Sequence, residues 1–252
     1  MFFLNVLLFF SIFTIIYSLV LMKNAVHVLT IQFQNVISWS EIPFLRGAII
    51  QALHGQASVL YHNHTVDSYR YAYPLIQYKR IRNKAALFCL KEGTEAIGDF
   101  LSEGNFACQL GDRLVEMEIE KVFSKKYTVQ IWDSVFRYRI SRWLPLNTEN
   151  YRKYREIDEC VEKISFLENI LIANLLSFTK GIGIHIESEI QCKFSSLSEP
   201  YQVTNKHVKL MAFDAEFKTN ISLPDYVGIG KNASIGYGVV TRINNENKIE
   251  NK

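Results

Sequence analysis

The sequence predicts an α+β protein with two tandem ferredoxin-like domains of βαββαβ order, the second of them modified. Three observations predict this fold class. The first half reads strand, helix, strand, strand, helix, strand, which is the order of a split βαβ unit. The second half repeats this order, with a glycine-rich loop in place of its second helix. The 252 residues are 48% hydrophobic, enough for two small cores.

The first half, residues 22–133, follows from hydrophobic periodicity and end signals. Residues 26–33 are rich in β-branched side chains and predict a strand. We expect Ser40 to cap a first helix and Thr94 to cap a second helix over 94–101. The other predicted elements are strands over 69–81 and 85–90 around a turn at Arg82-Asn83, and strands over 114–123 and 127–132 around 124–126.

One glycine, Gly47, lies inside the first predicted helix, where it costs about 1 kcal/mol relative to alanine. Two explanations stay open. The glycine permits close approach of another backbone or a phosphate, or it allows tight packing of the helix on the sheet.

The second half, residues 134–243, begins with a strand over 136–143. Apolar residues at three- and four-residue steps predict one long helix over 148–178, which ends near Gly181. Basic residues in its first turns oppose the helix macrodipole. We expect them either to serve a ligand or to lie in an exposed, frayed turn. Strands over 184–194 and 208–219 follow, and the polar tail over 244–252 is expected to be disordered.

Residues 1–21 form an uncharged, apolar leader, predicted as an extra N-terminal helix. Its length is close to the roughly 20 residues that a membrane helix requires. It lacks the basic start and the small-residue cleavage site of a signal peptide. We favour a third interpretation, in which translation starts at Met22 and the leader is not part of the protein.

The four cysteines are widely spaced and form no C-x-x-C pair. Cys89 and Cys160 lie in apolar periodic stretches, so we expect buried free thiols and no zinc site. The net charge is only +3. Basic residues nevertheless cluster beside aromatic ones, for example over 79–84 and 152–155, and such clusters indicate either a solvated face or an anion-binding groove.

A glycine-rich segment near the C-terminus contains Gly228, Gly230, Lys231, Gly236 and Gly238. It is not a P-loop, because no Ser or Thr follows the lysine, and it is not GxGxxG, because the last glycine is replaced by alanine. Exposed backbone N–H groups and a cation would suit a phosphate backbone. A purely structural hairpin is the alternative.

The segment His62-Asn63-His64 allows three interpretations. Two imidazoles could bind a metal, although a third ligand is not obvious nearby. They could also be ordinary loop histidines. As a catalytic pair, they could serve as general base and general acid near neutral pH, which RNA cleavage without a metal requires.

Taken together, FLRGAI, the histidine segment followed by YRYAYPLIQYKRI, and the closing VGIGKNASIGYGVV resemble the CRISPR-associated repeat-RNA endoribonucleases of the RAMP superfamily. The similarity is strongest to the subgroup of Bacteroidetes and methanogens, and it covers residues 22–243. It implies tandem ferredoxin-like domains, the glycine-rich loop as a hallmark, and no metal or other cofactor. It also implies one cut per repeat of a precursor CRISPR RNA, leaving 5′-hydroxyl and 2′,3′-cyclic phosphate ends.

The resemblance places catalysis on His62, His64 and Tyr71. A lysine that relatives carry upstream has no clear match here, and His54 lies nearest.

The implied partner is CRISPR repeat RNA, with an effector complex or a homodimer as further possibilities. We expect a cytoplasmic protein, or a membrane-anchored one facing the cytoplasm if the leader is real. A non-catalytic RAMP-type RNA-binding subunit is the alternative function. Besides the glycine-rich segment, the expected RNA contacts are Arg46, Arg70, Lys79, Arg80, Arg82, Lys84, Arg152, Lys153 and Arg155.

Overall fold

The computed structural model describes residues 24–52, 64–65, 68–69, 73–102, 107–205 and 208–244, a few of them by backbone alone. The predicted leader and nearly all of the predicted tail therefore lie outside the described residues. Within the described ranges, no helix is long and apolar enough to cross a bilayer.

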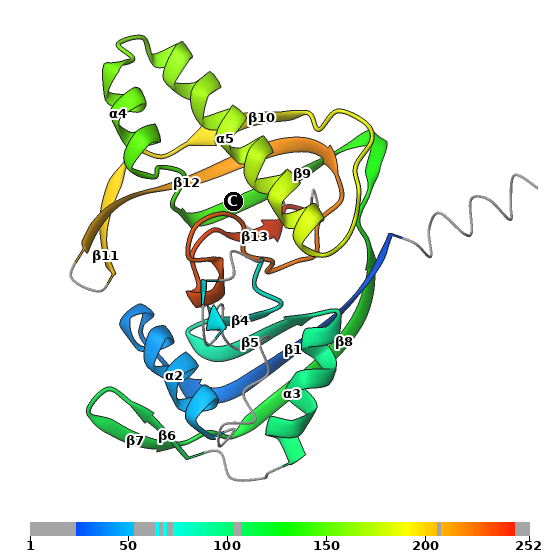
Figure 1. The fold of residues 1–252 in the computed structure, drawn as a ribbon, viewed down its shortest axis with the longest axis vertical. Coiled ribbons are helices and arrows are strands. Elements are labelled where there is room, and N and C mark those ends of the chain that lie inside the picture. Colours follow the sequence, from blue (N-terminus) through cyan, green and yellow to red (C-terminus); the bar gives the residue numbers. More distant parts are fainter. Residues whose placement is uncertain are drawn as a thin grey trace, which may run out of the picture.

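The first half forms a four-stranded antiparallel sheet in the order β4-β5-β1-β8 (Figure 1). Helices α2 and α3 pack on one face of this sheet, where their apolar residues meet those of β1, β4 and β5. Two short hairpins, β2–β3 and β6–β7, complete the half. The bounds are β1 Ala25–Val36, η1 Trp39–Glu41, α2 Ile42–Ala52, β2 His64–Thr65, β3 Ser68–Tyr69, β4 Ile76–Ile81, β5 Lys84–Leu90, α3 Glu92–Ser102, β6 Ala107–Leu110, β7 Arg113–Glu116 and β8 Ile119–Thr128.

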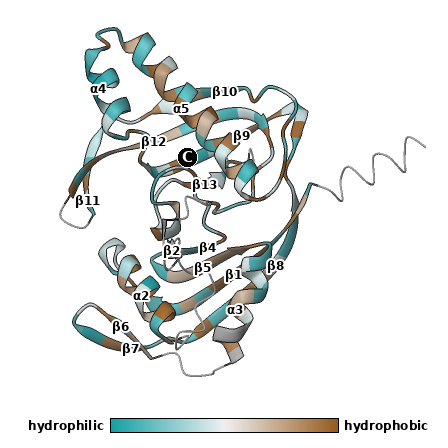
Figure 2. Cartoon of the chain, viewed as in Figure 1, coloured by the Kyte–Doolittle hydropathy of each residue, from teal (hydrophilic) through white to brown (hydrophobic). Residues whose placement is uncertain are grey.

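The second half forms another antiparallel sheet in the order β10-β12-β9-β13, with β11 paired to the far end of β12. Helix α5 packs on this sheet through buried residues at helical spacing, including Leu167, Leu171 and Leu175. Helix α4 has no buried residue and is drawn largely hydrophilic in Figure 2. The bounds are β9 Ile131–Trp143, α4 Thr148–Glu156, α5 Cys160–Gly181, β10 Cys192–Leu197, β11 Tyr201–Asn205, β12 Val208–Ile221, η2 Ala233–Ile235 and β13 Val239–Arg242.

The two halves share a core. The face of the first sheet that carries no helix contributes Val26, Val28, Phe88 and Leu90 to the same apolar cluster as β9, β12 and α5. The first sheet is therefore covered on both faces over part of its area, and the two halves pack against one another through this shared core.

Several predicted element ends in the first half are wrong. The first helical segment is capped by Ser38 and not by Ser40, because the Ser38 backbone N–H donates to the Glu41 carboxylate at 2.7 Å. Helix α3 begins at Glu92, two residues before the predicted cap. The strand predicted from residue 69 begins only at Ile76, after Pro74.

The turn predicted at 124–126 is absent from the described chain, because β8 pairs with β1 without interruption through those residues. The alternation predicted for the two flanking strands is therefore continuous. The actual break follows Thr128, and β9 starts at Ile131, before the predicted boundary between the halves.

Three predictions in the second half are corrected. The long helix is two helices, because Ile157 has extended backbone angles. The basic residues of α4 therefore lie near a helix C-terminus, where the macrodipole favours cations. The strand predicted from residue 184 begins at Cys192. Cys160 is exposed as the first residue of α5, whereas Cys89, Cys108 and Cys192 are buried free thiols.

Candidate functional site

The predicted catalytic segment lies mostly outside the described residues. His62, Arg70 and Tyr71 fall there, as does His54. His64 is described by its backbone, which pairs with Tyr69 in the β2–β3 hairpin. This hairpin follows α2 and precedes β4, so the segment belongs to the first half. The catalytic roles of the two histidines and the tyrosine stay predictions.

The basic end of β4 does not form one RNA-facing patch. Lys79 is fully buried, whereas Arg80 is half-buried and Arg82 is exposed in the turn to β5. Lys84 forms an ion pair with Glu120 across the sheet, at 2.8 Å. Lys79 and Arg80 point to opposite faces of the sheet because successive strand residues point in opposite directions. Lys79, one of the expected RNA contacts, is thus buried in the described structure, and its contact with RNA stays a prediction.

Lys79 lies against the shared core. Its ammonium group is 5.5 Å from the centre of the Phe88 ring and has no hydrogen-bond partner among the described residues. Burial lowers the pKa of Lys79 from 10.5 to about 7, because the charged form loses its hydration. A lysine in this position changes charge near neutral pH.

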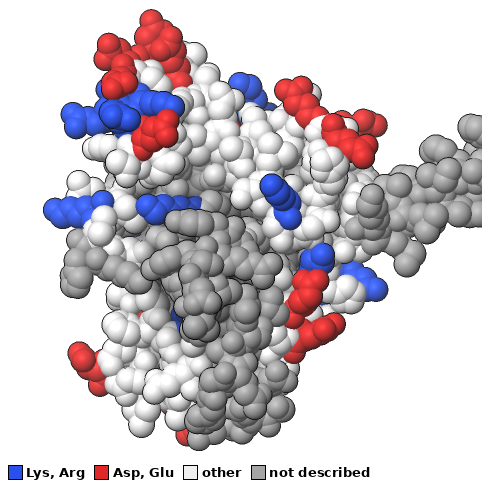
Figure 3. All heavy atoms as spheres, in the orientation of Figure 1, with Lys and Arg blue, Asp and Glu red and all other residues white. Residues whose placement is uncertain are grey.

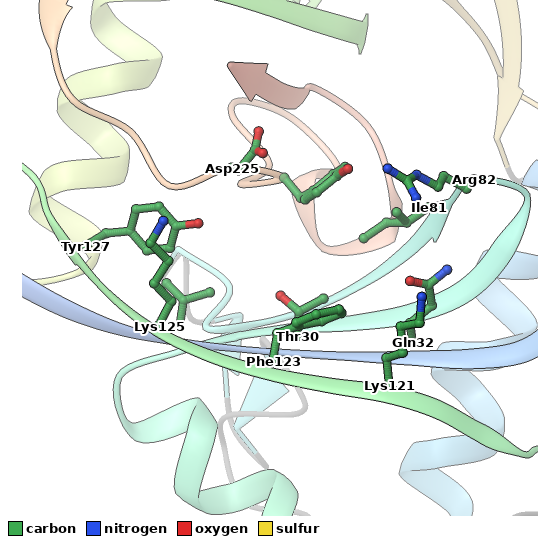
Figure 4. A pocket seen from close by; sticks show the side chains of 11 residues that line it. Thr30, Gln32, Ile81, Arg82, Lys121, Phe123, Lys125, Tyr127 and Asp225 are labelled. Carbon is green, nitrogen blue, oxygen red and sulfur yellow. The ribbon is translucent and has the colours of Figure 1, made fainter. Parts of the chain in front are cut away.

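A basic and aromatic groove opens on the helix-free face of the first sheet (Figure 4). Lys121, Phe123, Lys125 and Tyr127 project from alternate positions of β8, beside Thr30 and Gln32 of β1, their neighbours in the sheet. Arg82 closes one end, and Asp225 of the second half lies across the opening. Tyr226 also lines the groove. The groove has a volume of about 290 Å³. Cations beside aromatic rings suit single-stranded nucleic acid, whose phosphates and bases they contact respectively.

A second group of cations and rings joins the two halves. The guanidinium carbon of Arg142 lies 4.5 Å from the centre of the Trp39 ring and 4.9 Å from that of Tyr237. The guanidinium carbon of Arg80 lies 5.2 Å from the same Trp39 ring. Arg142 has a φ of 52°, a left-handed conformation that costs roughly 1–2 kcal/mol in a residue with a side chain. We call Trp39, Arg80, Arg142 and Tyr237 the arginine–indole stack.

The glycine-rich segment is packed rather than open. Gly228, Gly236 and Gly238 are buried, and only Lys231 is exposed among the five predicted residues. The Gly228 N–H donates to the Gln77 side chain at 2.9 Å, and the Gly238 N–H donates to the Arg142 carbonyl at 3.2 Å. The expectation of exposed N–H groups is therefore wrong at these two positions. Lys231 and the half-buried Gly230 stay candidates for RNA contact.

The remaining predicted contacts lie on two helices that are far apart (Figure 1). Arg46 is half-buried on α2, next to Gly47, whose missing side chain faces open space. The tight-packing explanation of Gly47 is thus wrong. Arg152, Lys153 and Arg155 are exposed on α4, and Lys153 pairs with Glu149 at 2.7 Å. Figure 3 shows blue and red side chains intermixed at that end of the molecule.

Reasoning from the sequence missed the groove and most of the stack. The groove has a signal in the sequence, since Lys121, Phe123, Lys125 and Tyr127 alternate with period two. The predicted turn at 124–126 concealed it. The stack has no such signal, because Trp39, Arg142 and Tyr237 are distant in sequence and meet only when the halves dock.

Two known domain families together match almost the whole described chain. Residues 24–128 match the Cas6b N-terminal domain, and residues 130–243 match the Cas6b C-terminal domain. An uncharacterized protein of Methanocaldococcus jannaschii is 36% identical over 112 residues, which are 44% of this chain and 75% of the relative.

Solved structures share the fold. A crystal structure of Cas6b has a TM-score of 0.76 and 25% sequence identity, with 87% of this chain and 100% of that chain covered. A structure of the CRISPR RNA processing endoribonuclease Cas6b has a TM-score of 0.66 and 24% identity, with the same coverage. A type IV Cas6 crRNA endonuclease, with a TM-score of 0.53 and 12% identity over the same shares, agrees in fold alone.

Proposed function

The chain belongs to the Cas6b family, and on that ground we propose that it is an endoribonuclease that cuts precursor CRISPR RNA within each repeat. The observation that carries this proposal is the match of both family domains, which together span 24–243. We also infer that the halves, residues 24–128 and 130–243, are tandem ferredoxin-like domains. The equal strand orders of the two sheets support that division.

The proposed reaction needs only proton transfers and stabilisation of charge. One histidine of the pair, His64, takes the proton of the 2′-hydroxyl group, and the 2′-oxygen then forms a bond to the neighbouring phosphorus. The bond from phosphorus to the 5′-oxygen breaks, and His62 gives that oxygen a proton. The products are a 2′,3′-cyclic phosphate and a 5′-hydroxyl. Tyr71 positions the phosphate or hydrogen-bonds to it in the transition state.

Binding of the RNA is supported by the groove on the first sheet. Three cations and three aromatic rings line it, and four of these six residues lie on β8, which pairs with β1. Each phosphate contact releases counterions, so repeat RNA should bind less tightly as salt increases.

The test is cleavage of the source organism's repeat RNA, with and without EDTA. The native protein should cut it in both conditions, and the His62→Ala/His64→Ala double variant should lose at least about 10²-fold in rate while retaining binding. His185→Ala, which changes an exposed histidine of the second half, is the matched control. Undiminished cutting by the double variant would refute the assignment of the histidines. RNA binding without cutting by the native protein would instead indicate a non-catalytic RNA-binding subunit.

A further inference from the structure

The arginine–indole stack holds two positive side chains on one ring at the junction of the halves. Trp39 lies in η1 and Arg80 in β4, both in the first half. Arg142 lies in β9, and Tyr237 follows η2, both in the second half. Both guanidinium groups lie within 5.2 Å of the centre of the indole ring. The pair forms only where the two halves meet.

The backbone conformation around Arg142 orients its side chain. Residues 141 and 142 of β9 stand opposite the single residue Asp214 of β12, which makes a β-bulge. The Asp214 carboxylate accepts hydrogen bonds from the Arg142 backbone N–H at 2.6 Å and from the Tyr201 hydroxyl at 2.8 Å. Bulges turn a side chain out of the regular alternation of a strand. Here the bulge and its carboxylate direct Arg142 to Trp39.

The glycine-rich segment packs beside the indole. A Cβ atom on Gly236 would lie 3.7 Å from the Trp39 ring and 2.8 Å from the Ile42 side chain. Gly236 also has a φ of 82°, which a residue with a side chain rarely adopts. On the next residue, the Tyr237 ring contacts Arg142. The segment thus supplies one wall of the stack, the Tyr237 ring.

Neither guanidinium group has a carboxylate partner among the described residues. Other arginines do, since Arg113 pairs with Glu41 and Arg139 pairs with Glu216, both at 2.6 Å. Arg80 uses its Nε–H for the Ile37 carbonyl at 2.6 Å, and Arg142 Nε is buried without a partner. The terminal nitrogen atoms of both groups keep their donors free of any hydrogen bond within the described structure. Two half-buried cations that share one ring without a counter-ion form a place for an anion.

We propose that Arg80 and Arg142, stacked on Trp39, bind a phosphodiester group of RNA at the junction between the halves. The ligand class rests on the proposed function. Planar guanidinium groups donate two parallel hydrogen bonds to phosphate oxygens, and stacking on an aromatic ring holds that plane in place. The contact is to the RNA backbone, so it adds affinity and orientation without reading the sequence.

The test measures binding against salt concentration for the full chain and its variants. The probes are the source organism's repeat and a twelve-residue oligouridine, both made of 2′-O-methyl nucleotides, which keep every phosphate but cannot be cut. Arg142→Ala should weaken binding about tenfold and should reduce the salt slope by about one. The Arg80→Ala/Arg142→Ala double variant should reduce the slope by about two. Arg139→Ala, in the same strand but ion-paired with Glu216, should change affinity less than twofold.

Thermal unfolding of each variant without RNA separates binding from folding. Arg142→Lys keeps the charge and loses the planar stack, so it should retain the salt slope and bind more weakly than the native protein. A lower melting temperature for Arg142→Ala with an unchanged salt slope would overturn the inference, since it would make the stack a structural contact only. Cleavage of unmodified repeat would then leave the proposed function standing.

The proposed function can also fail while the phosphate site stands. A reduced slope for Arg142→Ala in a protein that binds RNA but does not cut it would support the inference and refute the endonuclease. No measurable binding of either probe by the native protein would overturn both.

Discussion

The two halves build the same antiparallel strand order and complete their sheets differently. In the first half, α3 and the β6–β7 hairpin connect β5 to the edge strand β8. In the second half, β12 is connected to the edge strand β13 by residues 222–238, whose only helical part is the three-residue η2. The first connection covers its own sheet. The second connection packs on β4 and α2 of the first half. The segment that stands where the first half has a helix therefore forms part of the junction between the halves.

Glycines show the same contrast. Gly47 and Gly98, inside the helices of the first half, have no atom within 4 Å of an added Cβ, whereas Gly93 in the first turn of α3 would bring a Cβ to 2.7 Å from the Leu75 carbonyl oxygen. Gly228, Gly236 and Gly238, in the closing segment of the second half, would each bring a Cβ to less than 3.0 Å from another atom. Three glycines of the closing segment therefore lie where a side chain does not fit, and the predictions below test this and other differences between the halves.

The largest effect is expected for Gly238→Ala. The added Cβ would lie 1.9 Å from the Ile229 carbonyl oxygen, and the φ of 60° disfavours a residue with a side chain. We expect the free energy of unfolding to fall by roughly 3–5 kcal/mol, measured by urea unfolding. Gly98→Ala, the same change in α3, should not destabilise the protein. Equal effects of the two changes would refute the contrast between the halves.

The buried charges of the two halves differ in a similar way. In the second half, the buried Glu168 pairs with Lys193 at 2.6 Å and accepts the Phe194 backbone N–H at 2.9 Å. In the first half, Lys79 is buried against Phe88 with no hydrogen-bond partner among the described residues. A buried charge without a partner costs free energy, whereas a paired one offsets much of that cost.

Lys79→Met should therefore stabilise the protein below pH 7, by roughly 2–4 kcal/mol. The folded-state pKa, about 7, is below the unfolded value of 10.5, so the unfolded chain binds more protons between these pH values. The native protein should gain stability as pH rises from about 7 to 10.5, and the variant should lack that part of the gain. Chemical denaturation at pH 6, 8 and 10 measures the difference between the two proteins. A difference that does not change with pH would show that Lys79 titrates normally.

Gln77 tests the polar part of the junction. Its amide group donates to the Tyr73 hydroxyl at 2.8 Å and accepts the Gly228 N–H at 2.9 Å, while Tyr73 donates to the Gly228 carbonyl at 2.6 Å. Gln77→Ala leaves a buried N–H group unpaired, so we expect a loss of about 2 kcal/mol in the free energy of unfolding. In a double-mutant cycle with Tyr73→Phe, the two losses should not add, because the side chains share one network. Additive losses would argue against that network.

The parts of the fold that could be predicted from the sequence are those with local signals. β1 and β5 are apolar or alternating strands with clear ends, and the turn at Arg82-Asn83 is confirmed by two left-handed residues. The sequence also predicted that a loop replaces the helix of the second half. Pattern and composition are enough where a segment's structure depends on its own residues.

The predicted element boundaries are wrong where a segment distant in sequence determines the local structure. β8 continues through Ser124 because β1 lies beside it, and the polar residues 124–126 conceal the period-two alternation that runs through them. The break between α4 and α5 covers residues 157–159, where Ile157 and Glu159 have extended backbone angles, within a helical pattern that continues on both sides. For the site, the sequence and the family resemblance together indicated the histidines. The stack could not be predicted, because its members come from both halves.

The smallest effect is expected for Gly47→Ala, and it tests whether Gly47 serves the helix alone or also a ligand. Gly47→Ala in α2 meets no atom within 4 Å and removes backbone freedom of the unfolded chain, so it should stabilise the protein by about 0.5–1 kcal/mol. Gly98→Ala in α3 should give a similar gain and serves as the control. If RNA approaches the helix at Gly47, next to Arg46, then Gly47→Ala should also weaken RNA binding, whereas Gly98→Ala should leave it unchanged. Equal binding by the two variants would remove Gly47 from the RNA surface, and the open space beside it would need no ligand.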